Sequence, residues 1–198
     1  MAGLCSAAMY VIVILNAMFC EVAPKAAKSV NNPYNFTEFF KPPQFIWTYR
    51  SSWNAEFTCE RFTMKNISGK SVVVETKFTL YNRTYKHTTQ GTLYNVWGLD
   101  SYLNMLSMRD YWGDSLTKEI VYASNGYNCA VLQVERFWGW PPVTFDLIVK
   151  KSQLNKGPSE DCIQRYNEEI GKRRIGDTNR TVYIPECRKK KKNVTQTL

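Results

Sequence analysis

Downstream of residue 44, apolar and polar residues alternate or cluster in eight short segments rich in Val, Thr, Tyr, Phe and Trp. This composition and its short period favour β-strands. The predicted strands are residues 45–50, 56–64, 71–81, 85–97, 101–108, 119–123, 129–137 and 143–151. Turn-forming residues separate several of them, including Asn66-Ile67-Ser68-Gly69, Asn125-Gly126 and Pro141-Pro142. Eight consecutive antiparallel candidates predict an all-β fold, an eight-stranded antiparallel up-and-down barrel, which leaves no exposed sheet edge and can hold one small ligand.

Two segments have helical patterns. Residues 159–170 begin at a capping Ser159, stop before Gly171, and place apolar residues at three- and four-residue steps. Residues 34–40 form a short candidate helix that Pro42 and Pro43 end. We therefore expect one domain over residues 34–187, with the C-terminal helix packed outside the barrel, and no internal repeat.

The first 20 residues contain no charged side chain, and residues 9–19 are apolar except for Asn16. This run has the length of a signal-peptide core and is short for a membrane span. We predict a signal peptide over residues 1–20, cleaved between 20 and 27; a membrane anchor is the alternative. No later segment is apolar enough to cross a membrane.

Removal of that segment takes Cys5 and Cys20 with it and leaves four cysteines, an even set that indicates disulfides and an oxidising compartment. Sequence alone allows three pairings among them. Five Asn-X-Ser/Thr sequons also predict a secreted glycoprotein. The predicted glycosylation sites are Asn35, Asn66, Asn82, Asn179 and Asn193.

The formal net charge is +9, and residues 188–192 supply five of the positive charges. We interpret residues 188–198 as a basic disordered tail. The alternative is that this tail binds a heparan-like glycosaminoglycan or an anionic membrane. Nucleic acid is not an expected partner, because the aromatic residues are spread through the strands and the chain carries export signals.

The cysteines stand in a specific spacing. Trp53 lies six residues before Cys59, and Cys129-Ala130-Val131 is followed after fourteen residues by Asp146-Leu147-Ile148 and after thirteen more by Cys162. Between about Phe45 and Cys187 the chain resembles the tick salivary lipocalins, particularly their histamine-binding branch.

The resemblance implies disulfides Cys59–Cys187 and Cys129–Cys162. If Cys129 reaches the outer helix in this way, then Ala130, Leu132 and Val134 point into the barrel. The resemblance also implies that Thr144, Asp146 and Ile148 point inward, and that their neighbours pack beneath the helix.

Amine sites of this family use several acids with Trp and Tyr walls, because a buried ammonium needs a charged partner. Here the signature retains one acid, shortened from Glu to Asp146. Ala130 stands where the signature has Asp, Ile148 where it has an aromatic residue, and Lys118 where amine binders carry an acid. These differences shift the predicted interior toward neutral or cationic. The predicted ligand-binding residues are Trp53, Lys118, Ala130, Leu132, Asp146 and Ile148.

Two hypotheses for this pair stay open. Asp146 and Lys118 form an ion pair beside a lipid pocket, in which Lys118 meets a ligand carboxylate, or Asp146 alone holds one protonated amine. Either side chain could instead face solvent, and Trp53 could be ordinary barrel packing.

Catalysis is not expected. His87 is the only histidine, and no metal-binding, phosphate-binding or cofactor motif is present. By resemblance, the sequence predicts a secreted salivary lipocalin that sequesters a small host inflammatory mediator, histamine or a related biogenic amine. The alternatives are a lipid mediator as ligand, or a host immune protein bound through the outer surface.

Overall fold

The computed structural model describes residues 34–41, 44–96, 98, 102–138, 141–172, 178–188 and 195–197. The chain divides into two compact units, residues 1–31 and 32–198, and all described residues belong to the second. The predicted signal peptide and its cleavage region lie outside the described residues.

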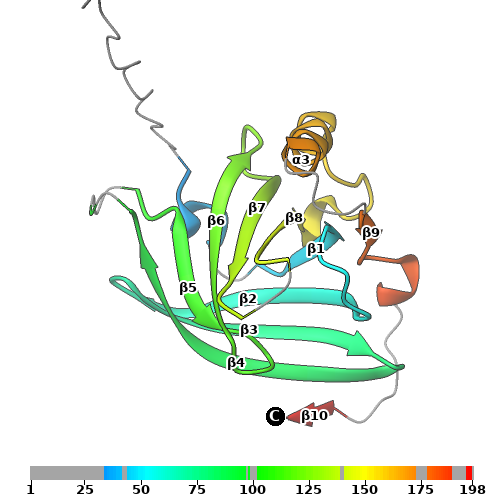
Figure 1. Ribbon diagram of the computed structural model, residues 1–198, viewed down its shortest axis with the longest axis horizontal. Coiled ribbons are helices and arrows are strands. Elements are labelled where there is room, and N and C mark those ends of the chain that lie inside the picture. The colour runs from blue at the N-terminus through cyan, green and yellow to red at the C-terminus, as the bar shows by residue number, and fades with distance from the viewer. Residues whose placement is uncertain are drawn as a thin grey trace, which may run out of the picture. The chain divides into compact units, whose positions relative to one another are not determined.

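Eight antiparallel strands form a closed barrel (Figure 1), as the sequence predicted. Their bounds are β1 Ile46–Ser51, β2 Thr58–Ser68, β3 Ser71–Leu80, β4 Arg83–Tyr94, β5 Met105–Arg109, β6 Ser115–Ala123, β7 Cys129–Arg136 and β8 Val143–Lys150. Each strand pairs with the next along the chain, β1 pairs with β8, and pairing between β4 and β5 is confined to the last four residues of β4.

Gly91 stands where β4 begins to pair with β5. A Cβ atom at this position would lie 2.8 Å from Cδ1 of Leu106 and 3.1 Å from the carbonyl oxygen of Ser107. The two strands approach this closely because the position has no side chain.

Two tight turns follow from residues that tolerate a positive φ. Tyr81 and Asn82 have φ of 47° and 63°, as a two-residue type I′ turn between β3 and β4 requires. Gly126, in the predicted Asn125-Gly126 turn between β6 and β7, has φ of 82°.

Apolar side chains fill one end of the barrel. The short helix α2, Phe36–Phe39, lies across this end, and Phe36, Phe39 and Phe40 are at most 1% exposed. They pack with inward-pointing residues of the strands, among them Phe62 and Leu132. We call this end the α2 end.

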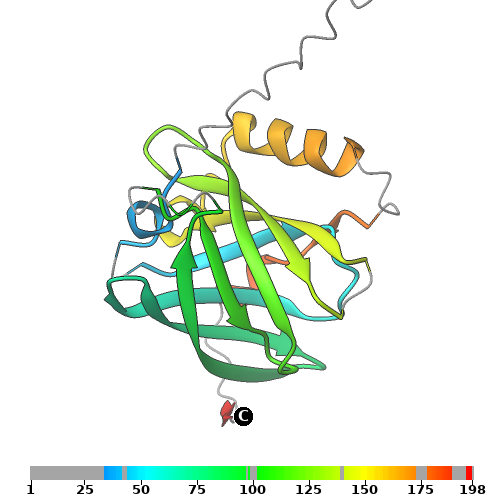
Figure 2. The ribbon, with the colours of Figure 1, turned by 60° about the vertical axis from the view of Figure 1, so that its left-hand side comes forward.

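The second apolar cluster lies outside the barrel, under helix α3, Glu160–Lys172 (Figure 2). Phe145, Leu147 and Val149 of β8 pack there against Cys162 and Tyr166 of the helix. The alternate residues of β7, including Ala130, Leu132 and Val134, belong to the interior cluster with Ile148. The facing predicted for both strands is confirmed.

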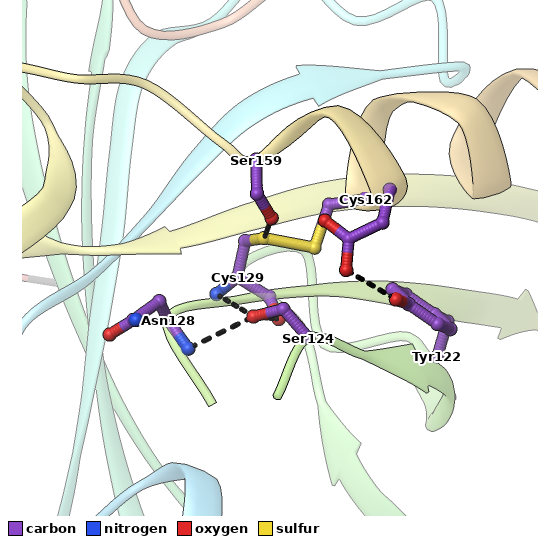
Figure 3. Close-up of a disulfide and its surroundings, with 7 residues drawn as sticks. Tyr122, Ser124, Asn128, Cys129, Ser159 and Cys162 are labelled. Atoms are coloured by element: carbon purple, nitrogen blue, oxygen red, sulfur yellow. Dashed lines mark hydrogen bonds between the residues drawn. A yellow bond between two sulfur atoms is a disulfide. The ribbon is translucent and has the colours of Figure 1, made fainter. Parts of the chain in front are cut away.

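The structure joins Cys59 to Cys187 and Cys129 to Cys162, the pairing that the resemblance implies. Around Cys129, the backbone amides of Asn128 and Cys129 donate to Oγ of Ser124, and Oγ of Ser159 lies 3.0 Å from the Cys129 sulfur (Figure 3). These contacts fix the start of α3 to the turn between β6 and β7.

The chain after α3 returns to the barrel. Strand β9, Arg180–Thr181, pairs with β1, and the 3₁₀ helix η2, Pro185–Arg188, follows; another 3₁₀ helix, η1, Lys151–Gln153, follows β8. Strand β10, Thr195–Thr197, pairs in parallel with β4. The tail was expected to be disordered, so this ordered strand within it differs from the prediction.

No helix of the described residues is long and apolar enough for a membrane span.

Candidate ligand-binding site in the barrel

A small cavity lies inside the barrel at the end opposite α2. It has about 40 Å³ of room for the centres of water-sized molecules, enough for a few waters when no ligand is bound. The lining residues are Trp53, Phe57, Glu60, Thr76, Phe78, His87, Met108, Asp110, Tyr111, Trp112, Leu116, Lys118 and Arg136. Aromatic and charged side chains therefore meet in one enclosed space.

Five aromatic rings surround the cavity in a closed series of contacts, which we call the aromatic collar: Trp53, Phe57, Phe78, Tyr111 and Trp112. Consecutive ring centroids lie 4.8–5.5 Å apart, and Trp112 returns to Trp53 at 5.4 Å. Such edge-to-face contacts stabilise aromatic clusters by about 0.5–1.5 kcal/mol each beyond their burial. Faces and edges of π systems thus line the site together with polar and charged side chains.

Arg180 of β9 supports the collar. Its side-chain nitrogens donate to the carbonyl oxygens of Trp53 at 2.7 Å and Phe57 at 2.6 Å, and its guanidinium lies 4.6 Å from the centroid of the Phe57 ring. The segment that carries β9 therefore fixes the connection between β1 and β2.

The carboxylates of Glu60 and Asp110 line the cavity, and each keeps one oxygen free. Oε2 of Glu60 accepts from the Thr48 hydroxyl at 2.5 Å, and Oδ1 of Asp110 accepts from the backbone amides of Trp112 and Asp114 at 2.9 and 3.0 Å. Within the described part of the chain, Oε1 of Glu60 and Oδ2 of Asp110 accept no hydrogen bond. Each can accept one from a ligand.

Two cations lie deeper and have protein partners. Nζ of Lys118 is 4.0 Å from Oδ2 of Asp146 and 4.8 Å from the centroid of the Phe62 ring. Oδ1 of Asp146 accepts from the Ser51 hydroxyl at 2.6 Å. Lys118 and Asp146 therefore form the internal ion pair that was one of the two sequence hypotheses.

The second cation is Arg136. Its guanidinium lies 3.6 Å from the centroid of the Trp53 ring and donates through Nη1 to Thr144 at 2.8 Å. Burial lowers the pKa of the guanidinium, and the negative charges of Asp146, Glu60 and Asp110 oppose that shift. Its Nε is buried and has no partner among the described residues, and the same holds for Nε2 of His87.

The charges in and next to the cavity balance. Three carboxylates, Glu60, Asp110 and Asp146, interact with three cations, Lys118, Arg136 and Arg180. The free oxygens of Glu60 and Asp110 are the groups that a cationic ligand can use.

The six predicted ligand-binding residues fall into two groups. Trp53 and Lys118 line the cavity, and Asp146 adjoins it through Lys118. Ala130, Leu132 and Ile148 point inward, but they are fully buried in the apolar cluster. Contact of any of these six residues with a ligand stays a prediction.

Sequence reasoning missed Glu60, Asp110 and His87 as residues that line the cavity. Glu60 shares the phase of Phe62 and Met64 on β2, so alternation could have placed it inside. Asp110 lies in the connection after β5, where no periodic signal exists.

Other candidate chemistry was also located. Cys129, Asp161 and Cys162 lie close enough to hold an ion, but both sulfurs belong to the disulfide and are not available as thiolates. Among the predicted glycosylation sites, Asn66, Asn82 and Asn179 are exposed, Asn35 is half-buried as the cap of α2, and Asn193 lies outside the described residues. Glycan attachment stays a prediction at all five.

Comparison with known proteins supports a common family and fold. The family described as tick histamine binding protein matches residues 17–189. Insecticyanin from the tobacco hornworm Manduca sexta has a TM-score of 0.56 at 12% identity, over 83% of this chain and 89% of that one. The siderocalin Ex-FABP gives 0.52 at 10% identity, over 70% and 91%. Japanin from Rhipicephalus appendiculatus, solved with cholesterol, gives 0.44 at 12% identity, over 63% and 85%. No curated protein matches the chain.

Proposed function

The chain belongs to the tick histamine-binding protein family, and from this premise we propose that it is a secreted salivary lipocalin that sequesters a small host amine, histamine or a close relative. The mechanism is stoichiometric binding without turnover. Removal of the mediator from solution would suppress the host response at the feeding site.

One observation carries the choice of an amine: Glu60 and Asp110 each keep a free oxygen inside the aromatic collar. An ammonium that reaches both oxygens would donate two charge-assisted hydrogen bonds, each worth about 1.5–3 kcal/mol. The rings of the collar add cation–π attraction of about 0.5–2 kcal/mol.

The filled α2 end argues against a long-chain lipid. Phe36, Phe39 and Phe40 occupy the interior that an acyl chain would need, and the remaining cavity is small. The observation that favours a lipid acid is the pair of cations, since Lys118 or the free Nε of Arg136 could meet a carboxylate. That ligand would first have to displace the phenylalanines.

Isothermal titration calorimetry with histamine, serotonin and a leukotriene tests the proposal, with Trp fluorescence as a second readout of the collar. We expect an amine to bind. We expect Glu60→Gln and Asp110→Asn each to weaken amine binding about 10- to 100-fold, which corresponds to one charge-assisted hydrogen bond. Glu168→Gln, an exposed acid on α3, is the matched control and should leave affinity unchanged.

Absence of heat with every amine at millimolar concentration would contradict the proposal. A leukotriene signal in its place would establish the lipid alternative. Native mass spectrometry of the glycosylated protein would reveal the remaining alternative, an empty barrel with a host protein on its outer surface.

A further inference from the structure

A row of three cations crosses the outer face of β2, β3 and β4. Arg61 lies directly opposite Lys77 in the β2–β3 register, and Lys77 lies directly opposite Lys86 in the β3–β4 register. The neighbours of these residues along each strand, such as Glu60, Phe78 and His87, line the cavity. Since successive side chains of a strand point to opposite faces, the cations point outward.

Cations placed this close together repel one another, and an anion between them relieves the repulsion. Directly opposite side chains have Cβ atoms about 4.5–5.5 Å apart, and like charges in such pairs are destabilising. One acid, Glu75, reduces the repulsion, since its carboxylate lies 2.5 Å from Lys65, 3.0 Å from Lys86 and 3.5 Å from Lys77. These lysines and Arg61 make four positive charges against one negative charge.

The C-terminal tail adds to the same surface. Thr195 pairs with Thr84, and Thr197 pairs with Lys86, so β10 lies at the end of the cation row. The basic run of residues 188–192 ends three residues before Thr195.

We propose that this outer face of β2–β4 binds a sulfated glycosaminoglycan. A flexible polyanion can place several sulfates along the row and so replace mutual repulsion with ion pairs. A membrane is the poorer partner. The exposed large hydrophobic residues of the described chain are Tyr81, Val96, Tyr102, Trp112, Phe137 and Trp138. None of them lies within β2, β3 or β4, so the row has no apolar anchor of the kind that interfacial binding uses.

Heparin-affinity chromatography and calorimetry with heparin test the proposal. Lys77→Gln/Lys86→Gln should weaken binding about tenfold at 0.1 M salt and lower the eluting salt concentration. The control Lys156→Gln/Lys172→Gln removes the same charge near and on α3 and should change affinity less than twofold. Glu75→Gln keeps every cation and removes the acid, so it should bind more tightly.

Heparin affinity should fall in the row variant Lys77→Gln/Lys86→Gln and rise in Glu75→Gln. The test therefore gives a result even if one of the two variants folds poorly. Equal losses in the row variant and the control would reduce the effect to net charge and overturn the proposal. So would unchanged elution of both, or binding to phosphatidylserine vesicles without binding to heparin. The amine affinity of the row variant should match that of the wild type. Failure of the heparin proposal would therefore leave the proposed amine site unaffected.

Discussion

Glu75 is the residue where burial and charge compete most directly. It is 6% exposed on the outer side of β3. Burial alone would raise the pKa of its carboxyl group, but hydrogen bonds from Lys65 and Lys86 and the charge of Lys77 lower it from 4.5 to about 2. A lowered pKa in the folded state means that folding is stabilised while the carboxylate is charged.

The resulting contribution should depend on pH. It is fully present above the unfolded pKa of 4.5 and is lost as pH falls from there toward 2, because the unfolded chain takes up the proton first. The shift corresponds to about 2–3 kcal/mol after allowance for solvent screening of the half-exposed lysines. Denaturant unfolding of Glu75→Gln should show that loss at pH 7 and almost no difference from wild type near pH 2. A constant difference at all pH values would assign the effect to packing.

Gly91 and Gly171 allow a matched prediction about elements. An alanine Cβ at Gly91 would meet Leu106 and the backbone of Ser107, where β4 closes the barrel on β5. Gly91→Ala should therefore destabilise the protein by about 1–3 kcal/mol. Gly171 lies in the last turn of α3 with no atom within 4 Å of a new Cβ, so Gly171→Ala should be neutral or stabilise by up to about 1 kcal/mol. Thermal unfolding of both variants measures these changes in stability. A stability change of the same sign in both variants would contradict the steric explanation.

The disulfide between β7 and α3 permits a second prediction at this scale. Cys129–Cys162 closes a loop of 33 residues, and its loss as Cys129→Ala/Cys162→Ala should cost about 3–4 kcal/mol in the chain-entropy account. The helix should then exchange its amide hydrogens faster than the barrel strands, since Tyr166 and its neighbours alone would retain it. Equal amide exchange rates in α3 and in the barrel strands would show that packing, and not the disulfide, holds α3.

Elements were more predictable than the site. All eight strands and α3 could be read from period, turn residues and caps, because a half-buried strand or helix imposes its own repeat on the sequence. The helix continues to Lys172 past the expected stop at Gly171, since the chain there has room to complete the turn. The register that opposes Arg61 to Lys77 could not be read, because it depends on irregular pairing within β2.

The site was predictable only where strand alternation reaches it. Asp146 and Lys118 were singled out by the family resemblance, and the contact between them agrees with one of the two hypotheses for the pair, the internal ion pair. Asp110, Tyr111 and Trp112 come from a connection whose conformation depends on hydrogen bonds to Asp110 itself. The aromatic collar combines residues of the β1–β2 connection, the end of β3 and the β5–β6 connection. No local pattern in the sequence predicts that these segments come together.

At the scale of the molecule, the barrel wall separates charge of opposite sign. On β2, Glu60 faces the cavity while the next residue, Arg61, belongs to the outer cation row. The same alternation places His87 inside and Lys86 outside on β4. A net charge of +9 therefore coexists with an interior in which three acids, Glu60, Asp110 and Asp146, interact with three cations, Lys118, Arg136 and Arg180. A protein held on a polyanion could still offer the free oxygens of Glu60 and Asp110 to a cation.

This interior predicts one bound amine per molecule. The α2 end is filled by phenylalanines, and the cavity bordered by the collar is small. Calorimetry should thus give a stoichiometry of one, and ligand at a hundred times its Kd should raise the free energy of unfolding by about 2.7 kcal/mol. Phe36→Ala/Phe40→Ala should lower stability by several kcal/mol and create room for an apolar probe such as a fatty acid. Two amines bound to the wild type would mean that the α2 end opens in solution and that its packing does not limit the site.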